Sequence, residues 1–136
     1  MLAELQNLLQ LPALGILLAA AGWLALVSLV MAFRPHLARR VLGAMGSTAE
    51  IHFGEHILRA IVGLALIVRA SHSQIEFAFF WGGWFVLLSS ILIMAVPRGL
   101  HHLYAQWWAE RIPITAYPIL APFSLAGAGA LAFCAW

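Results

Sequence analysis

IHFGEHILRAIVGLALIVRASHS, residues 51–73, begins with a polar cluster and continues as a long apolar segment. The uncharged run of residues 60–68 lies between Arg59 and Arg69. At a rise of about 1.5 Å per residue, a helix over residues 52–71 is about 30 Å long, which matches the hydrocarbon core of a bilayer. The sequence therefore predicts a transmembrane helix with ionisable side chains near its beginning.

The polar residues of this stretch gather on one side of the predicted helix. His52, His56 and Arg59 follow one another at spacings of four and three residues, so they share a face. Glu55 lies beside this face and precedes Arg59 by four residues, the order that favours an ion pair along a helix. Because ionisable groups at membrane depth are functional candidates, His52, Glu55, His56 and Arg59 form the candidate polar cluster. In the alternative interpretation, Arg59 only extends to the nearby headgroups.

The composition excludes a soluble domain. Of the 136 residues, 64% are hydrophobic and 9% are charged, whereas a soluble domain has about 25% charged residues. We therefore expect an integral membrane protein whose main partner is the lipid bilayer. A formal net charge of +2 gives no indication of nucleic-acid binding. The single cysteine, Cys134, excludes an intrachain disulfide and a Cys-x-x-Cys site.

Four apolar segments are long enough to cross a bilayer, at residues of about 12–33, 52–71, 75–96 and 114–135. They predict an all-α fold with one transmembrane domain that comprises the whole chain. Residues 1–10 predict a separate amphipathic helix at the membrane surface, with Pro12 at the start of the first span. Pro118 and Pro122 predict a kink in the last span. The short loop of residues 71–74 predicts that the second and third spans are antiparallel neighbours.

Two amphipathic connectors, residues 34–50 and 97–112, join the spans. Each predicts a helix on the membrane surface, and Ser47 or Thr48 is suited to cap the span that follows the first connector. The basic and aromatic residues of the connectors are the predicted interfacial anchors: Arg34, Arg39, Arg40, Arg98, Trp107 and Trp108. Five of the seven arginines lie in these connectors. The positive-inside rule therefore predicts cytoplasmic connectors and both termini outside, and the lack of a cleavable signal in residues 1–10 favours a bacterial inner membrane.

Two segments of the chain share an order of residues. GWLALVSLVMAFRPHLARR, residues 22–40, and GWFVLLSSILIMAVPRGLHH, residues 83–102, both contain Gly-Trp, Ser, Met-Ala, Pro and a basic pair. This likeness is consistent with two copies of one unit, residues 12–73 and 74–136, and one arrangement that follows is two tandem helical hairpins. Convergence is the other interpretation, because any span-connector-span unit needs a stop and a basic loop.

Small residues in the first and last spans predict close helix packing. Gly15, Ala19 and Gly22 follow one face of the first span, and Gly127 and Gly129 lie in a small-residue run of the last. We expect these faces to pack within the chain, or one of them to pack against a partner helix.

Three short motifs carry a resemblance to known proteins. GEHILRAIVGLALIVRAS (54–71), GGW (82–84) and YAQWWAER (104–111) together resemble a pattern of small four-span bacterial inner-membrane proteins. The resemblance covers most of the chain. It implies the four-span topology and implies no activity for any residue.

The segment His52-Phe53-Gly54-Glu55-His56 matches the H-x-x-E-H sequence of a zinc peptidase helix, in which two histidines bind the metal and the glutamate activates water. We interpret this match as coincidental, because Gly54 weakens the helix, no third ligand is evident, and the chain has no domain to hold a peptide. A broader metal or haem site is a further hypothesis, with ligands on the predicted cytoplasmic side: His52, His56, His101 and His102. Ordinary interfacial histidines are the favoured alternative, so no cofactor is expected.

These observations favour a non-enzymatic accessory, scaffold or assembly subunit of a larger membrane complex, since no catalytic constellation and no charged path through more than one helix is evident. One alternative is a homo-oligomeric transporter or channel that uses Glu55 and Arg59. Another is a haem- or metal-binding electron-transfer protein that uses the histidines.

Overall fold

The computed structural model is all-helical and describes residues 1–136, apart from the side chains of Leu2, Ala3 and Gln6. The elements follow in the order α1 (Leu2–Phe33), α2 (Pro35–Ala44), α3 (Ala49–Arg69), the 3₁₀ turn η1 (Ala70–His72), α4 (Glu76–Ala95), α5 (Arg98–Arg111) and α6 (Ala116–Ala135). Four segments are long and apolar enough to cross a membrane: Asn7–Phe33, Ala49–His72, Glu76–Ala95 and Ala116–Ala135. The all-α prediction is confirmed, and these four candidate spans agree with the predicted multi-pass fold.

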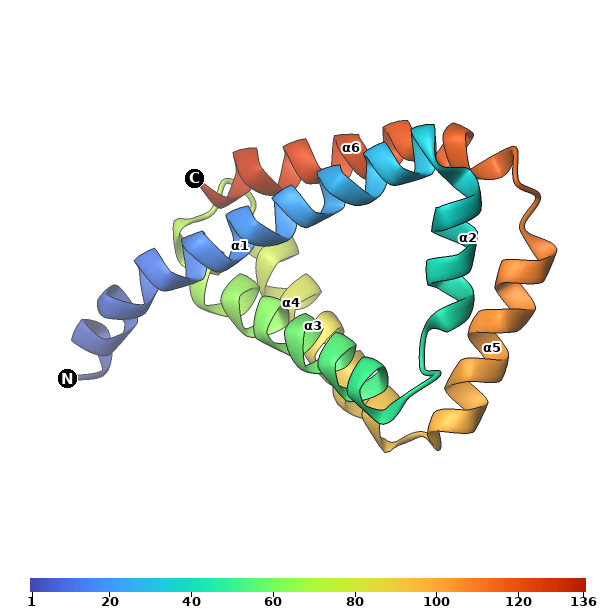
Figure 1. Ribbon diagram of the computed structural model, residues 1–136. Helices are drawn as coiled ribbons and strands as arrows, with labels where there is room; N and C mark the ends of the chain where they lie inside the picture. The colour runs from blue at the N-terminus through green and yellow to red at the C-terminus, as the bar shows by residue number, and fades with distance from the viewer.

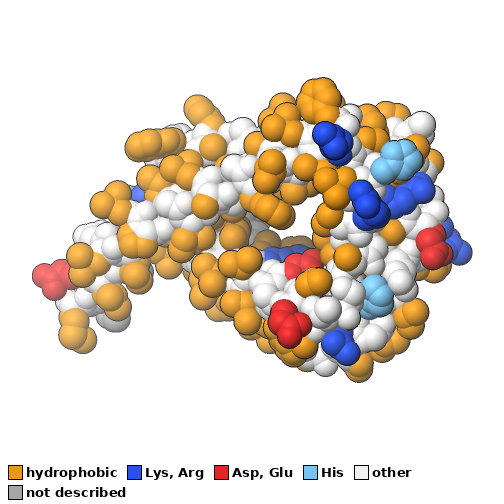
Figure 2. All heavy atoms as spheres, viewed as in Figure 1, with side chains coloured by type: hydrophobic (Ala, Val, Ile, Leu, Met, Phe, Trp, Pro, Cys, Tyr) orange, Lys and Arg blue, Asp and Glu red, His pale blue; other side chains and the backbone are white. Residues whose placement is uncertain are grey.

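The helices form a three-sided frame (Figure 1). Helices α1 and α6 make one antiparallel pair, and α3 and α4 make a second. The two pairs meet at one end, beside the C-terminus, and diverge from there. The two connector helices, α2 and α5, pack against each other and form the third side. A space-filling view shows a hollow between the three sides (Figure 2).

All four spans meet in one apolar core at the closed end of the frame. Leu17 of α1 is 0% exposed and packs in a cluster with Ala65 of α3, Phe79 of α4 and Ala135 of α6. Burial of these side chains away from water or lipid fixes the two pairs relative to each other at this end.

Hydrogen bonds from Arg69 reinforce this core. The side chain is 9% exposed, and its Nε donates to the carbonyl of Ala135 at 2.7 Å. Its other nitrogens donate to the carbonyl of Trp136 and to Oε1 of Gln10, both at 3.3 Å. One guanidinium therefore joins α3 to α1 and occupies the last carbonyls of α6, where a cation also complements the helix dipole.

The α1–α6 pair packs through alanine and serine rather than through the predicted glycines. Ala121, Ala128 and Ala135 recur every seven residues on α6 and are all buried. Ser28 of α1 donates a hydrogen bond to the carbonyl of Ala121 at 2.7 Å.

The predicted glycine faces look away from the chain. A Cβ built on Gly15, Gly22, Gly127 or Gly129 would meet no described atom within 4 Å. The prediction that these faces pack within the chain is therefore wrong, and packing against a partner helix stays a prediction.

The α3–α4 pair is the place of closest helix approach. A Cβ on Gly63 would lie 2.8 Å from the backbone nitrogen of Leu87, and a Cβ on Gly83 would lie 2.8 Å from the carbonyl oxygen of Gly63. Only glycine allows two backbones to come this near. The predicted antiparallel pairing of these spans is confirmed.

The separate helix expected over residues 1–10 is wrong, because α1 continues through Pro12 without a break. A proline inside a helix removes one backbone hydrogen bond, a loss that packing on both sides can offset. Gln10 and Ala13 are both buried and hold the chain in line before and after the proline. At the other end of the chain, Pro118 lies in the first turn of α6, and the helix continues through Pro122.

The tandem-hairpin arrangement is wrong as well. The long pairs are α1 with α6 and α3 with α4, so each pair takes one helix from each half of the sequence. If residues 12–73 and 74–136 were exchanged, α1 would take the place of α4 and α3 that of α6. The α1–α6 pair would then become the α3–α4 pair, and α2 would still pair with α5. The duplication itself stays a prediction.

Candidate metal site

Three histidines from two elements meet at the corner where α3 approaches α5. His52 and His56 lie one turn apart in the first turns of α3, and His101 lies in the first turn of α5. The hydroxyl of Thr48 accepts a hydrogen bond from the backbone N–H of Ile51 at 3.2 Å, which confirms the predicted cap and fixes where α3 begins. Because this cap fixes where α3 begins, it also fixes the positions of His52 and His56 within the first turns of the helix.

The imidazole rings converge closely. The Nδ1 atoms of His52 and His101 are 3.0 Å apart. The ring centroid of His56 lies 5.4 Å from that of His52 and 5.0 Å from that of His101. One nitrogen of each ring falls within 4.8 Å of the other two. Zinc–nitrogen bonds of about 2.0–2.1 Å place ligand nitrogens within about 4 Å of one another, so a small movement of the rings would let them share an ion.

Three of the four ring nitrogens of His52 and His56 lack a hydrogen-bond partner in the described chain. His52 is 1% exposed and His56 is 2% exposed. Neither ring nitrogen of His56, nor Nε2 of His52, has a partner in the described chain. Buried polar atoms without partners cost free energy, so two such histidines side by side need a compensating interaction. A metal ion would provide it.

His101, the third histidine, packs against the turn that ends the first connector. Gly46, in the turn between α2 and α3, has φ +70°, and a Cβ there would lie 2.8 Å from Nδ1 of His101. His102 turns to Met45, with its Nδ1 3.0 Å from that carbonyl oxygen. His102 is thus outside the cluster, and the ligand set suggested by the sequence is corrected to His52, His56 and His101.

The surroundings of His101 favour the neutral imidazole, the form that binds metals. Burial lowers its pKa, and the neighbouring His52 and His102 lower it further.

Glu55 and Arg59 do not pair with each other. Arg59 donates from NH2 to the hydroxyl of Ser89 on α4 at 3.1 Å. Among the described side chains no carboxylate forms an ion pair with Arg59, so the predicted pair is wrong. Glu55 is half-buried, and its Oε2 is enclosed without a hydrogen-bond partner. Ser89 lies on α4, which packs closely against α3.

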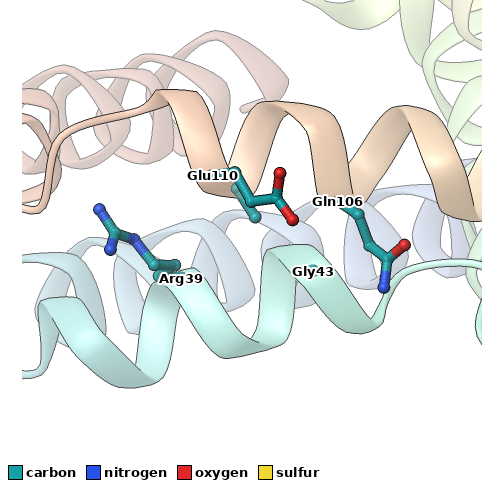
Figure 3. A pocket seen from close by; sticks show the side chains of 5 residues that line it. Arg39, Gly43, Gln106 and Glu110 are labelled. Atoms are coloured by element: carbon teal, nitrogen blue, oxygen red, sulfur yellow. The ribbon is translucent and has the colours of Figure 1, made fainter.

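The arginine and tryptophan anchors divide into two groups. Arg39 donates to the carbonyl of Ile112 at 2.8 Å and so ties α2 to the end of α5. A shallow groove lies between α2 and α5, lined by Arg39 and Gly43 of α2 and by Gln106 and Glu110 of α5 (Figure 3). The others are largely exposed, consistent with a surface role that stays a prediction: Arg34, Arg40, Arg98, Trp107 and Trp108.

Sequence reasoning missed one of the residues that matter most. Arg69 entered it only as the boundary of the uncharged run, although its place at the end of an apolar span was a signal for a buried or capping role. His101 was named among four candidate ligands, but the sequence did not show that His101, rather than His102, joins His52 and His56.

Comparison with known proteins adds no assignment: no protein-family model, curated protein or solved structure matches the chain.

Proposed function

We propose that this chain is a multi-pass membrane protein that binds a divalent transition metal through His52, His56 and His101. The observation that supports this most directly is the burial of two histidines with three unpartnered ring nitrogens against a third imidazole. Neutral imidazole is a ligand of zinc, copper and nickel, whereas magnesium and calcium prefer oxygen. Zinc is the ion we propose, because three imidazoles on one side leave its usual tetrahedral fourth position.

Haem fits the same residues less well. The two axial histidines of a b-type haem approach the iron from opposite faces of the porphyrin. Here the Nδ1 atoms of His52 and His101 are 3.0 Å apart, which leaves no room for a porphyrin between them.

Metal analysis of the purified protein tests the proposal. We expect about one zinc ion per chain in the wild type and loss of the ion in His52→Ala, His56→Ala and His101→Ala. His36→Ala, at an exposed position on α2, is the matched control and should retain the metal. A wild type without metal, or full retention by His101→Ala, would contradict the proposal.

We further propose a bacterial inner membrane, with α2 and α5 cytoplasmic and both termini outside. The excess of arginine in the two connectors supports this orientation. Single cysteines at the exposed positions Ser47 and Ser71, in a Cys134→Ser background, would test it. An impermeant maleimide should label Ser71→Cys in intact cells and Ser47→Cys only after permeabilisation.

The accessory or assembly role, and the homo-oligomeric transporter or channel, stay predictions of the sequence. A bound metal is compatible with the first, because a structural ion stabilises a fold without catalysing a reaction. The hydrogen bond from Arg59 to Ser89 weighs against the second, since it occupies the guanidinium that a transport path through Arg59 would use.

A further inference from the structure

We propose that Glu55 is the fourth ligand of the metal site, so that three imidazole nitrogens and one carboxylate oxygen hold the ion. This inference rests on the metal binding proposed above and adds a residue to it. It also specifies the kind of site. Four protein ligands leave no open position on the ion, which is typical of a structural zinc site.

The helix places Glu55 beside the two histidines that precede and follow it. With about 100° per residue, Glu55 projects about 60° to one side of His52, and His56 projects about 40° to the other. Helix α3 is continuous over these residues, so the three side chains leave one arc of its surface. In helical bundles a glutamate and the histidine three residues after it bind metals together, and His52 and Glu55 have this spacing in the reverse order.

One carboxylate oxygen of the half-buried Glu55 lacks a partner in the described chain. Its Oε2 is enclosed by the protein and has no hydrogen bond. The nearest cation along the helix, Arg59, is engaged by Ser89. A carboxylate in such surroundings needs a cation, and a divalent ion at the adjacent histidines would supply one.

The closed site requires that the Glu55 side chain turn toward the three histidines. The three histidine nitrogens already lie within 4.8 Å of one another, and Glu55 stands outside that group. Its side chain has three rotatable bonds, and no hydrogen bond restrains Oε2. With Glu55 bound, zinc has the four ligands of a structural site, and no position remains for a reactive water.

Zinc affinity and the visible spectrum of the Co²⁺-substituted protein test this inference. We expect Glu55→Gln to weaken zinc binding about 100-fold and to change the Co²⁺ spectrum, because an oxygen anion leaves the coordination sphere. Glu50→Gln is the matched control, since Glu50 lies exposed on the first turn of the same helix, and it should match the wild type in both readouts. Glu55→Asp, which retains a carboxylate, should recover part of the affinity.

Two results would overturn the inference, and they differ in what else they affect. If Glu55→Gln binds zinc as tightly as the wild type with an unchanged Co²⁺ spectrum, Glu55 is not a ligand, although the three-histidine site stands. If the wild type itself binds neither ion, the proposed function fails together with the inference. Circular dichroism of each variant would identify one that has lost its helices.

Discussion

At the scale of single residues, Gly46 controls the candidate site without being one of its ligands. Its φ of +70° is a conformation that costs a residue with a side chain about 1–2 kcal/mol, and a Cβ would also lie 2.8 Å from Nδ1 of His101. We predict that Gly46→Ala lowers stability by about this amount and weakens zinc binding about 10-fold, because His101 must move. Titration with zinc and thermal unfolding would measure both effects.

Gly54→Ala is the control for this prediction. Gly54 lies in α3 between the two ligand histidines, but a Cβ there would meet no described atom within 4 Å. Alanine should therefore leave zinc affinity unchanged and raise stability by up to about 1 kcal/mol. Equal zinc affinity in Gly46→Ala and the wild type would show that Gly46 does not position His101.

Sequence spacing groups the ligands of one helix of the site, whereas His101 of the other helix was only one of several candidates. Spacings of three and four residues place His52, Glu55 and His56 together, and a Thr48 cap fixes the start of their helix. His101 follows His56 only after 45 residues, and α3, α4 and both turns separate the two. No local periodicity connects such positions, because they meet only when α2 pairs with α5.

At the scale of helices, the approach of α3 to α4 depends on two glycines. A Cβ on Gly63 would lie 2.8 Å from the nitrogen of Leu87 and 2.9 Å from the carbonyl of Gly83, both of them backbone atoms that cannot rotate away. We predict that Gly63→Ala lowers stability by about 1–3 kcal/mol, because the helices must separate. Thermal unfolding in detergent would measure the loss.

Gly127→Ala on α6 is the matched change for this pair, because a Cβ there would meet no described atom within 4 Å. Purified alone, this variant should unfold at the temperature of the wild type or slightly above it, because alanine favours the helix. If Gly63→Ala is equally stable, the α3–α4 contact is looser than the structure shows.

Helix positions were more predictable than helix partners. Apolar runs, caps and prolines locate all four spans, since these signals are local. Partner choice depends on small differences between faces: the buried row Ala121, Ala128 and Ala135 lies beside the glycines that the sequence favoured. The helix break predicted before Pro12 is wrong for a similar reason. Burial of Gln10 and Ala13 outweighs the tendency of the proline to interrupt the helix.

At the scale of the whole molecule, the frame has two corners of different kinds where α3 meets other elements. At one corner, Arg69 and an apolar core join α3 to α1 and α6. At the other, the described polar contacts between α3 and α5 are those of the histidine cluster. At the second corner, three ring nitrogens of His52 and His56 have no partner in the described chain, and the proposed ion would supply one. The hollow in Figure 2 lies between the sides that these corners hold together.

This difference predicts that metal removal loosens one corner only. Spin labels at Leu92 of α4 and Leu103 of α5, which are 67% and 61% exposed, would report the distance across the histidine corner in a Cys134→Ser background. With zinc we expect one narrow distance distribution, and with a chelator a broader and longer one, because α5 loses its link to α3. Labels at Leu8 and Phe77, which are 73% and 75% exposed near the Arg69 corner, should give the same distribution in both conditions. A Leu92–Leu103 distribution that is unchanged by the chelator would show that helix packing alone holds the frame closed, and the metal would then have no part in its shape.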